Sequence, residues 1–585
     1  MMSLKYKLFS AGCSIIAALA LGACSDWDDH FNADASILPS QNTNLWENIK
    51  NDGELTQFAA LIEKTGYDKI IAGSQSFTIW APKDNATGFD YTSLTALSDS
   101  VLINDFVKNH ISRANTLLSG QKNQERVYML NNKLMHISGN SSSEGIGSYT
   151  IQDIGLSMPN IATANGTLHK LEGRIPFTPN IYESLDTTNH QIDSIAKYFR
   201  KYHKREIDKS KSTAGPALNG ELTYIDTVYS ESNSLYSLFN AYINHEDSSY
   251  TMILPTNKAW TEAKTTISEF YNYAPEFSVL QTVATATGTK DTIVNVALRD
   301  PEQLKDSMVN RMLVQNLFYN NNIYDNKKLK EMQTGDAITC DSLFSTHKTG
   351  GEYDTKIYKE DIEALFKDAV RTDKSNGAVW LTDHLDMRTW TSWNPEIRIE
   401  AESGSALLKA DYCTVETSTI TIGSQNPEVS GHVSNNSYIV AEPLYAGAHP
   451  DVYISLPGVR STEYCVYVVF VPANITNTKA DTISHKMQIE INYADASGKR
   501  KTQSFGNSNF NNPQIIDSMY VGNITFPVAY AGTGDYKPYI RIRSRVSSRE
   551  NYDEHLRIDC IILRPKALDD YLKAHPDYKY DRGNN

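Results

Sequence analysis

The same local pattern occurs twice in this chain, and the duplication constrains the fold more than any other feature. A short apolar run that ends in a proline turn lies at Phe77–Ala86 and again at Tyr250–Ala259. Each run is followed by an Asn-Gly pair, at residues 165–166 and 376–377, which is typical of a tight turn. Because the landmarks recur in the same order, we expect two domains with one common architecture.

These landmarks resemble those of fasciclin-like domains. The resemblance rests on the strand and turn of residues 77–86, a helical pattern that ends at His110, and the Asn-Gly-x-x-His pattern of residues 165–169. It implies an α+β fasciclin-like domain at residues 43–186 and a second one, with insertions, at residues 229–392.

The second copy is the longer of the two, by about 40 residues between the proline turn and the Asn-Gly pair. We expect this excess to form surface insertions around residues 277–300 and 340–375, because long surface loops cost little closure entropy. Residues 187–228 are expected to be a linker between the copies. Their basic run is interpreted as a solvated face.

Beyond Trp393, apolar residues alternate with polar ones, and turn signals separate the short runs. This pattern predicts an antiparallel β-sandwich over residues 393–566, followed by a polar tail at residues 567–585. The segments Ile399–Glu402 and Arg557–Pro565 resemble the first and last strands of jelly-roll carbohydrate-binding modules. The expected fold class is therefore multidomain, with two α+β fasciclin-like domains followed by an all-β, jelly-roll-like sandwich.

The start of the chain reads as an export signal. Lys5 and Lys7 precede an apolar run, Ala11–Leu21, which is shorter than the about 20 residues that a membrane-spanning helix needs. The run ends in Leu-Gly-Ala-Cys, which resembles the lipobox of bacterial lipoproteins. The resemblance implies that residues 1–23 are removed and that Cys24 is lipidated. An ordinary signal peptide with an incidental cysteine is the alternative.

The residues after Cys24 indicate a destination. Ser25–Asp29 is an acidic cluster that resembles the signal sending Bacteroidetes lipoproteins to the outer face of the outer membrane. Residues 24–42 are expected to be the lipidated N-terminus and a flexible stalk. We therefore expect a surface-exposed protein that is anchored in the outer membrane by lipid, with a starch-utilisation-type (SusC/SusD-like) transporter complex as one candidate partner.

Net charge and cysteine spacing argue against some classes of partner and metal site. The formal net charge of −14 argues against a nucleic-acid partner, because nucleic-acid phosphates demand a basic surface. The sequence has no Cys-x-x-Cys pair, so the usual spacing of a structural zinc site is absent. An extracytoplasmic compartment permits disulfides, but spacing leaves open whether any form. The cysteines that remain beyond Cys24 are Cys340, Cys413, Cys465 and Cys560.

No catalytic motif supports an enzyme. The sequence has no His-Glu-x-x-His, no Gly-x-Ser-x-Gly and no phosphate-binding loop, so we expect a non-enzymatic protein. The acidic pair Asp569-Asp570 falls in the predicted polar tail, where no pocket is expected to tune its pKa values. A hydrolase remains an alternative, because glycosidase carboxylates need no local motif.

Two histidines of the first copy occupy positions where fasciclin-like domains usually carry them. These are His110 and His169. In the family a Tyr-His dipeptide at the first position has been tied to adhesion, whereas this chain has Asn109-His110. Hydrogen-bonded core histidines that stabilise a hairpin are the simpler interpretation.

Three acidic residues of the predicted sandwich form a candidate metal site. Glu400, Glu402 and Asp559 match strands that flank a structural Ca²⁺ in some carbohydrate-binding modules, and carboxylate oxygens are ligands that Ca²⁺ prefers. The resemblance thus implies a structural calcium, the one cofactor that we consider. A salt-bridged or solvated face is the alternative.

Two further groups are candidates for ligand binding. Arg541, Arg543 and Arg545 lie on one side of a predicted strand, where they could bind an acidic sugar or a partner's carboxylates. The alternative is a solvent face paired with acidic neighbours. Aromatic platforms that could stack on sugar rings are expected at Tyr438, Tyr445 and Tyr453.

Together these features predict a cell-surface lipoprotein that binds an extracellular ligand, with a glycan as the first choice. Several rigid modules on a stalk suit such capture, because they provide more than one site and reach. An adhesion protein, or a scaffold subunit acting through protein–protein contacts, is the alternative.

Overall fold

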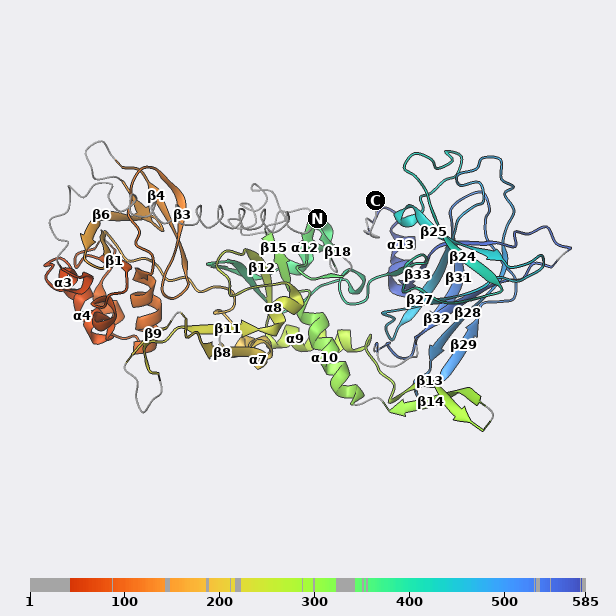
Figure 1. Cartoon of the computed structure of the whole chain (residues 1–585), viewed down its shortest axis with the longest axis horizontal. Helices are drawn as coiled ribbons and strands as arrows, with labels where there is room; N and C mark the ends of the chain where they lie inside the picture. The colour runs from red at the N-terminus through yellow and green to blue at the C-terminus, as the bar shows by residue number, and fades with distance from the viewer. Residues whose placement is uncertain are drawn as a thin grey trace, which may run out of the picture. The chain divides into compact units, whose positions relative to one another are not determined.

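The computed structural model divides into two compact units, Met1–Thr178 with Glu206–Ser230, and Pro179–Arg205 with Glu231–Asn585 (Figure 1). The predicted signal peptide, Cys24, the stalk and Cys340 lie outside the residues that the structure describes. The described residues are 43–86, 88–141, 148–185, 189–210, 212–215, 222–286, 288–297, 300–321, 342–349, 352–353, 356–530, 532, 537–547, 549–578 and 580.

The first unit is built on a seven-stranded sheet in the order β2-β1-β7-β6-β5-β4-β3. All six residues of β1 are buried, as expected for a central strand with a continuous apolar run. β1 pairs parallel with β7, and the other pairings are antiparallel. The strands are β1 (Phe77–Pro82), β2 (Ile111–Ser112), β3 (Lys122–Tyr128), β4 (Leu134–Gly139), β5 (Thr150–Ile151), β6 (Ile154–Thr163) and β7 (Gly166–Leu171).

Short helices cover this sheet and share a core with β1. The first helix begins with a capping box, in which Asn44 and Glu47 each accept a hydrogen bond from the other's backbone. The carboxylate of Asp84, just after β1, caps the next helix by accepting from the N–H groups of Thr56 and Gln57. The helices are α3 (Leu45–Lys50), α4 (Thr56–Lys64), α5 (Tyr67–Ile71), η1 (Tyr91–Leu94), α6 (Asp99–Val101), η2 (Leu102–Val107) and η3 (Lys108–His110).

The second unit begins with a similar arrangement. Its four-stranded sheet has the order β15-β12-β21-β20, and β12 runs parallel to β21 with Tyr250 opposite Gly377, just as Phe77 lies opposite Gly166 in the first unit. The strands are β12 (Tyr250–Pro255), β15 (Phe318–Asn320), β20 (Val370–Lys374) and β21 (Gly377–Thr382). The helices around them are η4 (His190–Ile192), α7 (Asp193–Lys201), α8 (Ser234–Phe239), α9 (Asn257–Ser268), α10 (Pro301–Val314), α12 (Lys359–Phe366) and η6 (Thr389–Thr391).

One expectation about a connecting segment needs correction. Helix α7 lies within the stretch predicted as a linker, and its Ile195 and Phe199 are buried in the core of the second unit. The first predicted insertion, around residues 277–300, is a hairpin of β13 (Glu276–Thr285) and β14 (Gly288–Ala297). The remaining short strands are β8 (His203–Ile207), β9 (Thr213–Ala214), β10 (Tyr224–Asp226), β11 (Tyr229–Asn233), β16 (Ser342–Phe344), β17 (Lys348–Thr349), β18 (Glu352–Tyr353) and β19 (Lys356–Tyr358).

The rest of the second unit contains two six-stranded antiparallel sheets. The first has the order β24-β25-β33-β27-β31, with β22 paired to β33, and the second has the order β23-β26-β32-β28-β29, with β30 paired to β28. The first sheet comprises β22 (Ile397–Glu400), β24 (Cys413–Thr419), β25 (Ser437–Pro443), β27 (Glu463–Phe470), β31 (Asp517–Thr525) and β33 (Leu556–Pro565). The second comprises β23 (Leu407–Asp411), β26 (Asp451–Ser455), β28 (Lys486–Ala494), β29 (Arg500–Ser504), β30 (Asn509–Phe510) and β32 (Tyr539–Ser544).

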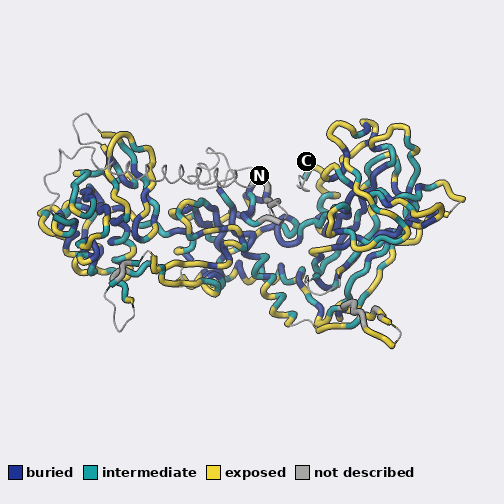
Figure 2. Tube along the Cα trace, in the orientation of Figure 1, coloured by how far each residue is buried: buried dark blue, intermediate teal, exposed yellow. Residues whose placement is uncertain are grey.

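Alternating residues of both sheets bury one common hydrophobic core. Ile399 and Val466 of the first sheet and Val452, Ile489 and Ile540 of the second belong to the same cluster. Figure 2 shows buried residues along the inner strands of both sheets, such as β27 and β33, whereas the outer strands β24 and β29 also carry exposed residues. The intervening residues of the second sheet therefore face away from the core, and they carry the site described next.

Candidate functional site

The outward side of the second sheet gathers aromatic and charged side chains. Val452 and Ile454 of β26 point into the core, so Tyr453 points outward, opposite Arg541 of β32. On the other flank, Arg541 lies opposite Glu490 of β28. We call this surface the Tyr453 face; its members are Lys409, Asp411, Asp451, Tyr453, Glu490, Tyr539, Arg541 and Arg543.

A buried carboxylate organises the charges on the Tyr453 face. The side chain of Asp451 is fully buried and accepts hydrogen bonds from Arg541 Nε (2.9 Å), Arg541 Nη2 (2.6 Å) and Arg543 Nε (2.8 Å). Arg541 Nη1 also lies 3.3 Å from Glu490 Oε2. The hydrogen bond with Asp451 raises the pKa of Arg541. Both guanidinium groups are therefore held in place by carboxylates of the face itself.

Two tyrosine rings lie beside this network. The ring centroids of Tyr453 and Tyr539 are 5.7 Å apart, and the Arg541 guanidinium lies 5.3 Å from the Tyr453 centroid. The Lys409 ammonium is 5.3 Å from the same centroid and 2.6 Å from a carboxylate oxygen of Asp411. The face thus combines aromatic rings with fixed donors and acceptors, a combination that suits polar ligands with an apolar side.

Only some of the predicted ligand-binding residues lie on the Tyr453 face. Tyr453, Arg541 and Arg543 lie together on the Tyr453 face. Both arginines are paired with an acidic neighbour, which is the alternative that the sequence left open for them. Arg545 is exposed but follows the last residue of β32. Tyr445 is also exposed, at 62%, in the segment after β25.

The expectation of an exposed platform at Tyr438 is wrong. This side chain is only 6% exposed and packs in a small cluster with Val429, Val433 and Ile475. Conversely, Asp451 and Tyr539 belong to the Tyr453 face but were not predicted from the sequence. The alternation of Asp451 and Tyr453 with buried aliphatic residues was the available signal for at least the first of them.

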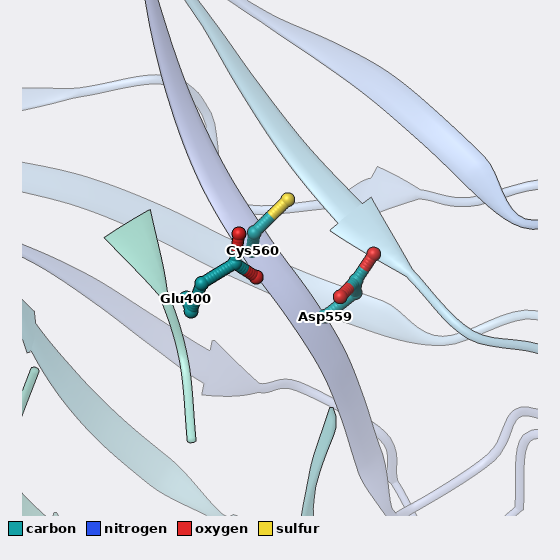
Figure 3. Close-up of side chains that lie close together, drawn as sticks. All are labelled: Glu400, Asp559 and Cys560. Atoms are coloured by element: carbon teal, nitrogen blue, oxygen red, sulfur yellow. The ribbon is translucent and has the colours of Figure 1, made fainter. Parts of the chain in front are cut away.

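The predicted acidic cluster forms in part, with Cys560 in place of Glu402 beside Glu400 and Asp559. Ligand atoms of Glu400, Asp559 and Cys560 lie within 4.8 Å of one another, where β22 pairs with β33 (Figure 3). Ser434 connects two of them, because its N–H donates to Asp559 Oδ2 (3.1 Å) and its hydroxyl donates to Glu400 Oε1 (2.7 Å). Asp559 is 1% exposed, and its Oδ1 has no hydrogen-bond partner within the described part of the chain.

The electrostatics of this cluster favour a hard cation. Burial, together with the neighbouring Glu400 and Glu402, raises the pKa of Asp559 to about 8. Glu402 Oε2 is a second buried carboxylate oxygen without a partner among the described residues. Burial also raises the pKa of Cys560, so its sulfur remains a thiol and is a poor metal ligand. Orphaned carboxylate oxygens fit Ca²⁺ better than a thiophilic metal.

The histidines of the first unit are structural. His110 Nδ1 lies 2.7 Å from the Phe106 carbonyl, and its Nε2 accepts from the Ile175 N–H at 2.9 Å. His169 stacks on Trp80 with a centroid distance of 4.3 Å. Burial lowers the pKa of each histidine to about 4, so both are neutral at pH 7. These contacts fit the interpretation of core histidines.

Comparison with known proteins identifies one family within the chain. Residues 53–175 match the fasciclin domain family. No curated protein matches the chain in sequence. None of the helices in the described ranges has the length and hydrophobicity of a membrane-spanning helix.

Several solved structures are similar at low identity. A FAS1 domain pair of the insect cell adhesion molecule fasciclin I shares 12% identity and covers 58% of this chain and 99% of its own, with a TM-score of 0.20. The C-terminal family 22 carbohydrate-binding module of Clostridium thermocellum Xyn10B shares 14% identity and covers 29% of this chain and 92% of its own, with a TM-score of 0.17. A xylan-binding domain of the same module family has the same identity, coverage of 29% and 93%, and a TM-score of 0.17.

Proposed function

We propose that this protein is a non-enzymatic binding protein that captures an extracellular glycan on the Tyr453 face. The observation that carries the proposal is the pair Tyr453 and Tyr539 beside the fixed network of Asp451, Arg541 and Glu490. A sugar ring has an apolar side that stacks on an aromatic ring and hydroxyl groups that both donate and accept hydrogen bonds. The ion pairs of the face hold these side chains in place, so binding orders few of them.

The remaining modules would present this face to the medium. The parallel pairing of β12 with β21 supports a second fasciclin-like domain at residues 229–392, and the shared core of the two C-terminal sheets supports a jelly-roll-like sandwich. The sequence around Cys24 supports a lipid anchor at the outer membrane surface, and the acidic cluster after it supports a Bacteroidetes-type exported lipoprotein. A SusC/SusD-like transporter remains the proposed acceptor of the captured glycan.

We also propose that Glu400, Glu402 and Asp559 hold a structural Ca²⁺. The buried, unpartnered Oδ1 of Asp559 supports this site, because a bound cation would compensate the cost of burying that carboxylate. The site joins β22, β33 and the segment at Ser434, so the ion would stabilise the fold rather than contact a glycan on the other sheet.

The direct test is binding of purified residues 25–585 to a panel of neutral and acidic polysaccharides. Retention on at least one glycan supports the proposal. If the protein is retained on no glycan of the panel, and the polysaccharide chain length is unchanged after long incubation, the proposal that the ligand is a glycan is overturned. Release of shortened products would instead support the hydrolase alternative and contradict a purely binding role.

The second candidate function is adhesion or scaffolding through protein–protein contacts. The match of residues 53–175 to the fasciclin domain favours it, because fasciclin-like domains mostly mediate adhesion. Affinity capture of the full chain from solubilised native outer membranes distinguishes the two. A stoichiometric protein partner, in the absence of any glycan binding, supports the scaffold.

A further inference from the structure

Two parts of the second unit touch directly around Tyr271. Tyr271, in the segment after α9, donates to the Trp393 carbonyl (3.4 Å) and accepts a hydrogen bond from Arg460 Nε at 2.9 Å. Nearby, the Ser461 N–H donates to the Phe270 carbonyl (2.9 Å). The bonds of Arg460 and Ser461 join residues 179–205 and 231–393, which we call the 179–393 part, to the loops of the two C-terminal sheets, and both parts belong to one compact unit.

A second connection is made by a segment for which the sequence predicts a polar tail. Residues Lys566–Ala574 form helix α13, which packs on the first sheet with Leu568 fully buried. Asp569 is 1% exposed, accepts from the Tyr467 hydroxyl (2.6 Å) and pairs with Arg564 (3.2 Å). Side-chain hydrogen bonds oppose the effect of burial and lower the pKa of Asp569 to about 2. This carboxylate therefore fixes α13 to the sheet, contrary to the expectation of an untuned acidic pair.

The other side of the same segment contacts residues of the 179–393 part. The Arg388 guanidinium lies over the rings of Tyr571 (4.4 Å to the centroid) and Tyr578 (5.2 Å). Arg388 Nε also donates to Asp361 of α12 at 2.6 Å, and the Tyr578 hydroxyl donates to the other oxygen of Asp361 at 3.3 Å. One arginine is thus enclosed by two tyrosines from α13 and its extension and by a carboxylate from α12.

Tyr580 extends this contact over the connection between the two parts. Its hydroxyl donates to the Trp390 carbonyl (3.4 Å) and accepts from the Glu396 N–H (3.2 Å). Glu396 in turn pairs with Arg564 of β33 at 2.6 Å. The segment from α13 to Tyr580 therefore contacts α12, the connecting residues Trp390 and Glu396, and the first sheet.

We propose that residues 566–578 and Tyr580 form a clasp that makes the 179–393 part and the two C-terminal sheets open and unfold as one unit. Arg388 is the residue of the 179–393 part that the two tyrosines of the clasp bind. The contacts around Tyr271 named above are hydrogen bonds, and interfaces between domains of one chain usually permit relative motion unless they are large and hydrophobic. A segment that binds both parts at once raises the effective concentration of each for the other.

The test compares hydrogen exchange of β21 and β33 in the full chain, measured by mass spectrometry across a series of urea concentrations. In the native protein we expect the most protected amides of both strands to exchange through the same opening. In the double variant Tyr571→Ala/Tyr578→Ala we expect exchange in β21 to accelerate at least tenfold relative to β33. Tyr412→Ala, at a tyrosine that is 54% exposed outside the clasp, should leave the ratio unchanged.

Tyr578→Phe keeps the experiment decisive if the double variant fails to fold. It removes only the hydroxyl that reaches Asp361, and we expect at least a twofold change of the same ratio. A double variant that folds and retains the native ratio overturns the clasp. If the double variant does not fold, an unchanged ratio in Tyr578→Phe overturns it.

Discussion

Asn165 and Asn376 hold equivalent corners of two different sheets through the same three hydrogen bonds. Asn165 Oδ1 accepts from the N–H of Leu45, the first residue of α3, at 2.8 Å. Its Nδ2 donates to the carbonyls of Ile71 (2.8 Å) and Gly73 (2.7 Å). Asn376 repeats this pattern in the second unit. The Asn-Gly pair is therefore a tertiary anchor as well as a turn.

The glycine of each pair has an equally specific role. Gly166 and Gly377 have positive φ angles of 151° and 134°. A Cβ atom added to either would lie 1.9 Å from a backbone oxygen, that of Phe77 or of Tyr250 respectively. No side chain fits such a distance, so the second residue of the pair must be glycine in both copies.

Replacing Asn376 with Ala should destabilise the second unit strongly. The change removes the acceptor for the Ile181 N–H (2.9 Å) and the donor to the Ile243 and His245 carbonyls (2.8 and 3.1 Å). Leaving buried groups unsatisfied costs about 1–3 kcal/mol each, so we expect a loss of roughly 2–5 kcal/mol. Urea unfolding measures it. Asn551→Ala, at an exposed position, should stay within about 0.5 kcal/mol of the native protein, and an equal loss there would contradict the anchor.

The stability of the first unit should fall as the pH drops from 6.5 to 4. Burial lowers the pKa values of His110 and His169 from 6.5 to about 4, so between these pH values the unfolded chain binds more protons than the folded chain. The stabilisation is complete above pH 6.5 and is lost as pH falls through 4. Each histidine contributes roughly 3 kcal/mol by this linkage.

Urea midpoints between pH 4 and 8, followed by hydrogen exchange in β1 and β7, check this dependence. His190 provides the control, because its side chain is 85% exposed. His190→Gln should leave the pH profile of these strands unchanged. A profile that is flat from pH 8 to 4 in the native protein would contradict neutral core histidines.

Removing Ca²⁺ should destabilise the second unit without affecting the first. At a free ion concentration of about 100 times Kd, a site found only in the folded state adds about 2.7 kcal/mol. Chelation should therefore lower the melting temperature of the second unit by several degrees, as measured by calorimetry. Asp559→Asn should abolish the response to Ca²⁺, whereas Asp495→Asn, in an exposed turn, should preserve it. A response that survives in Asp559→Asn would place the ion elsewhere.

The sequence reveals features whose chemistry is local. The Asn-Gly pairs and the proline turns after β1 and β12 depend on a few adjacent residues, so they could be recognised and aligned between the copies. The alternation of β32 is local in the same sense, and it predicts Arg541 and Arg543 on one side of the strand. That Tyr453 lies beside them depends on the pairing of β26 with β32, which the sequence does not reveal.

Features decided by distant contacts could not be predicted in this way. Tyr438 has polar neighbours in sequence, but Val471 and Ile475, over 30 residues away, help to bury it. The sequence around Asp569 predicts a solvated tail because its partner Tyr467 lies 102 residues earlier, on a strand of the first sheet. The burial of Asp451 likewise depends on a strand about 90 residues later.

Binding at the Tyr453 face should depend on the ring more than on charge. In Tyr453→Ala we expect affinity for a bound glycan to fall about tenfold, because an aromatic contact contributes roughly 0.5–1.5 kcal/mol beyond its buried area. The cations of the face are already paired with Asp411, Asp451 and Glu490, so moderate salt should change affinity less than twofold. Isothermal titration with an oligosaccharide taken from the panel measures both effects. Tyr412→Ala is the matched control, since its ring is 54% exposed and lies outside the face. Equal losses in the two tyrosine variants, or a strong salt dependence, would show that the glycan binds somewhere other than the Tyr453 face.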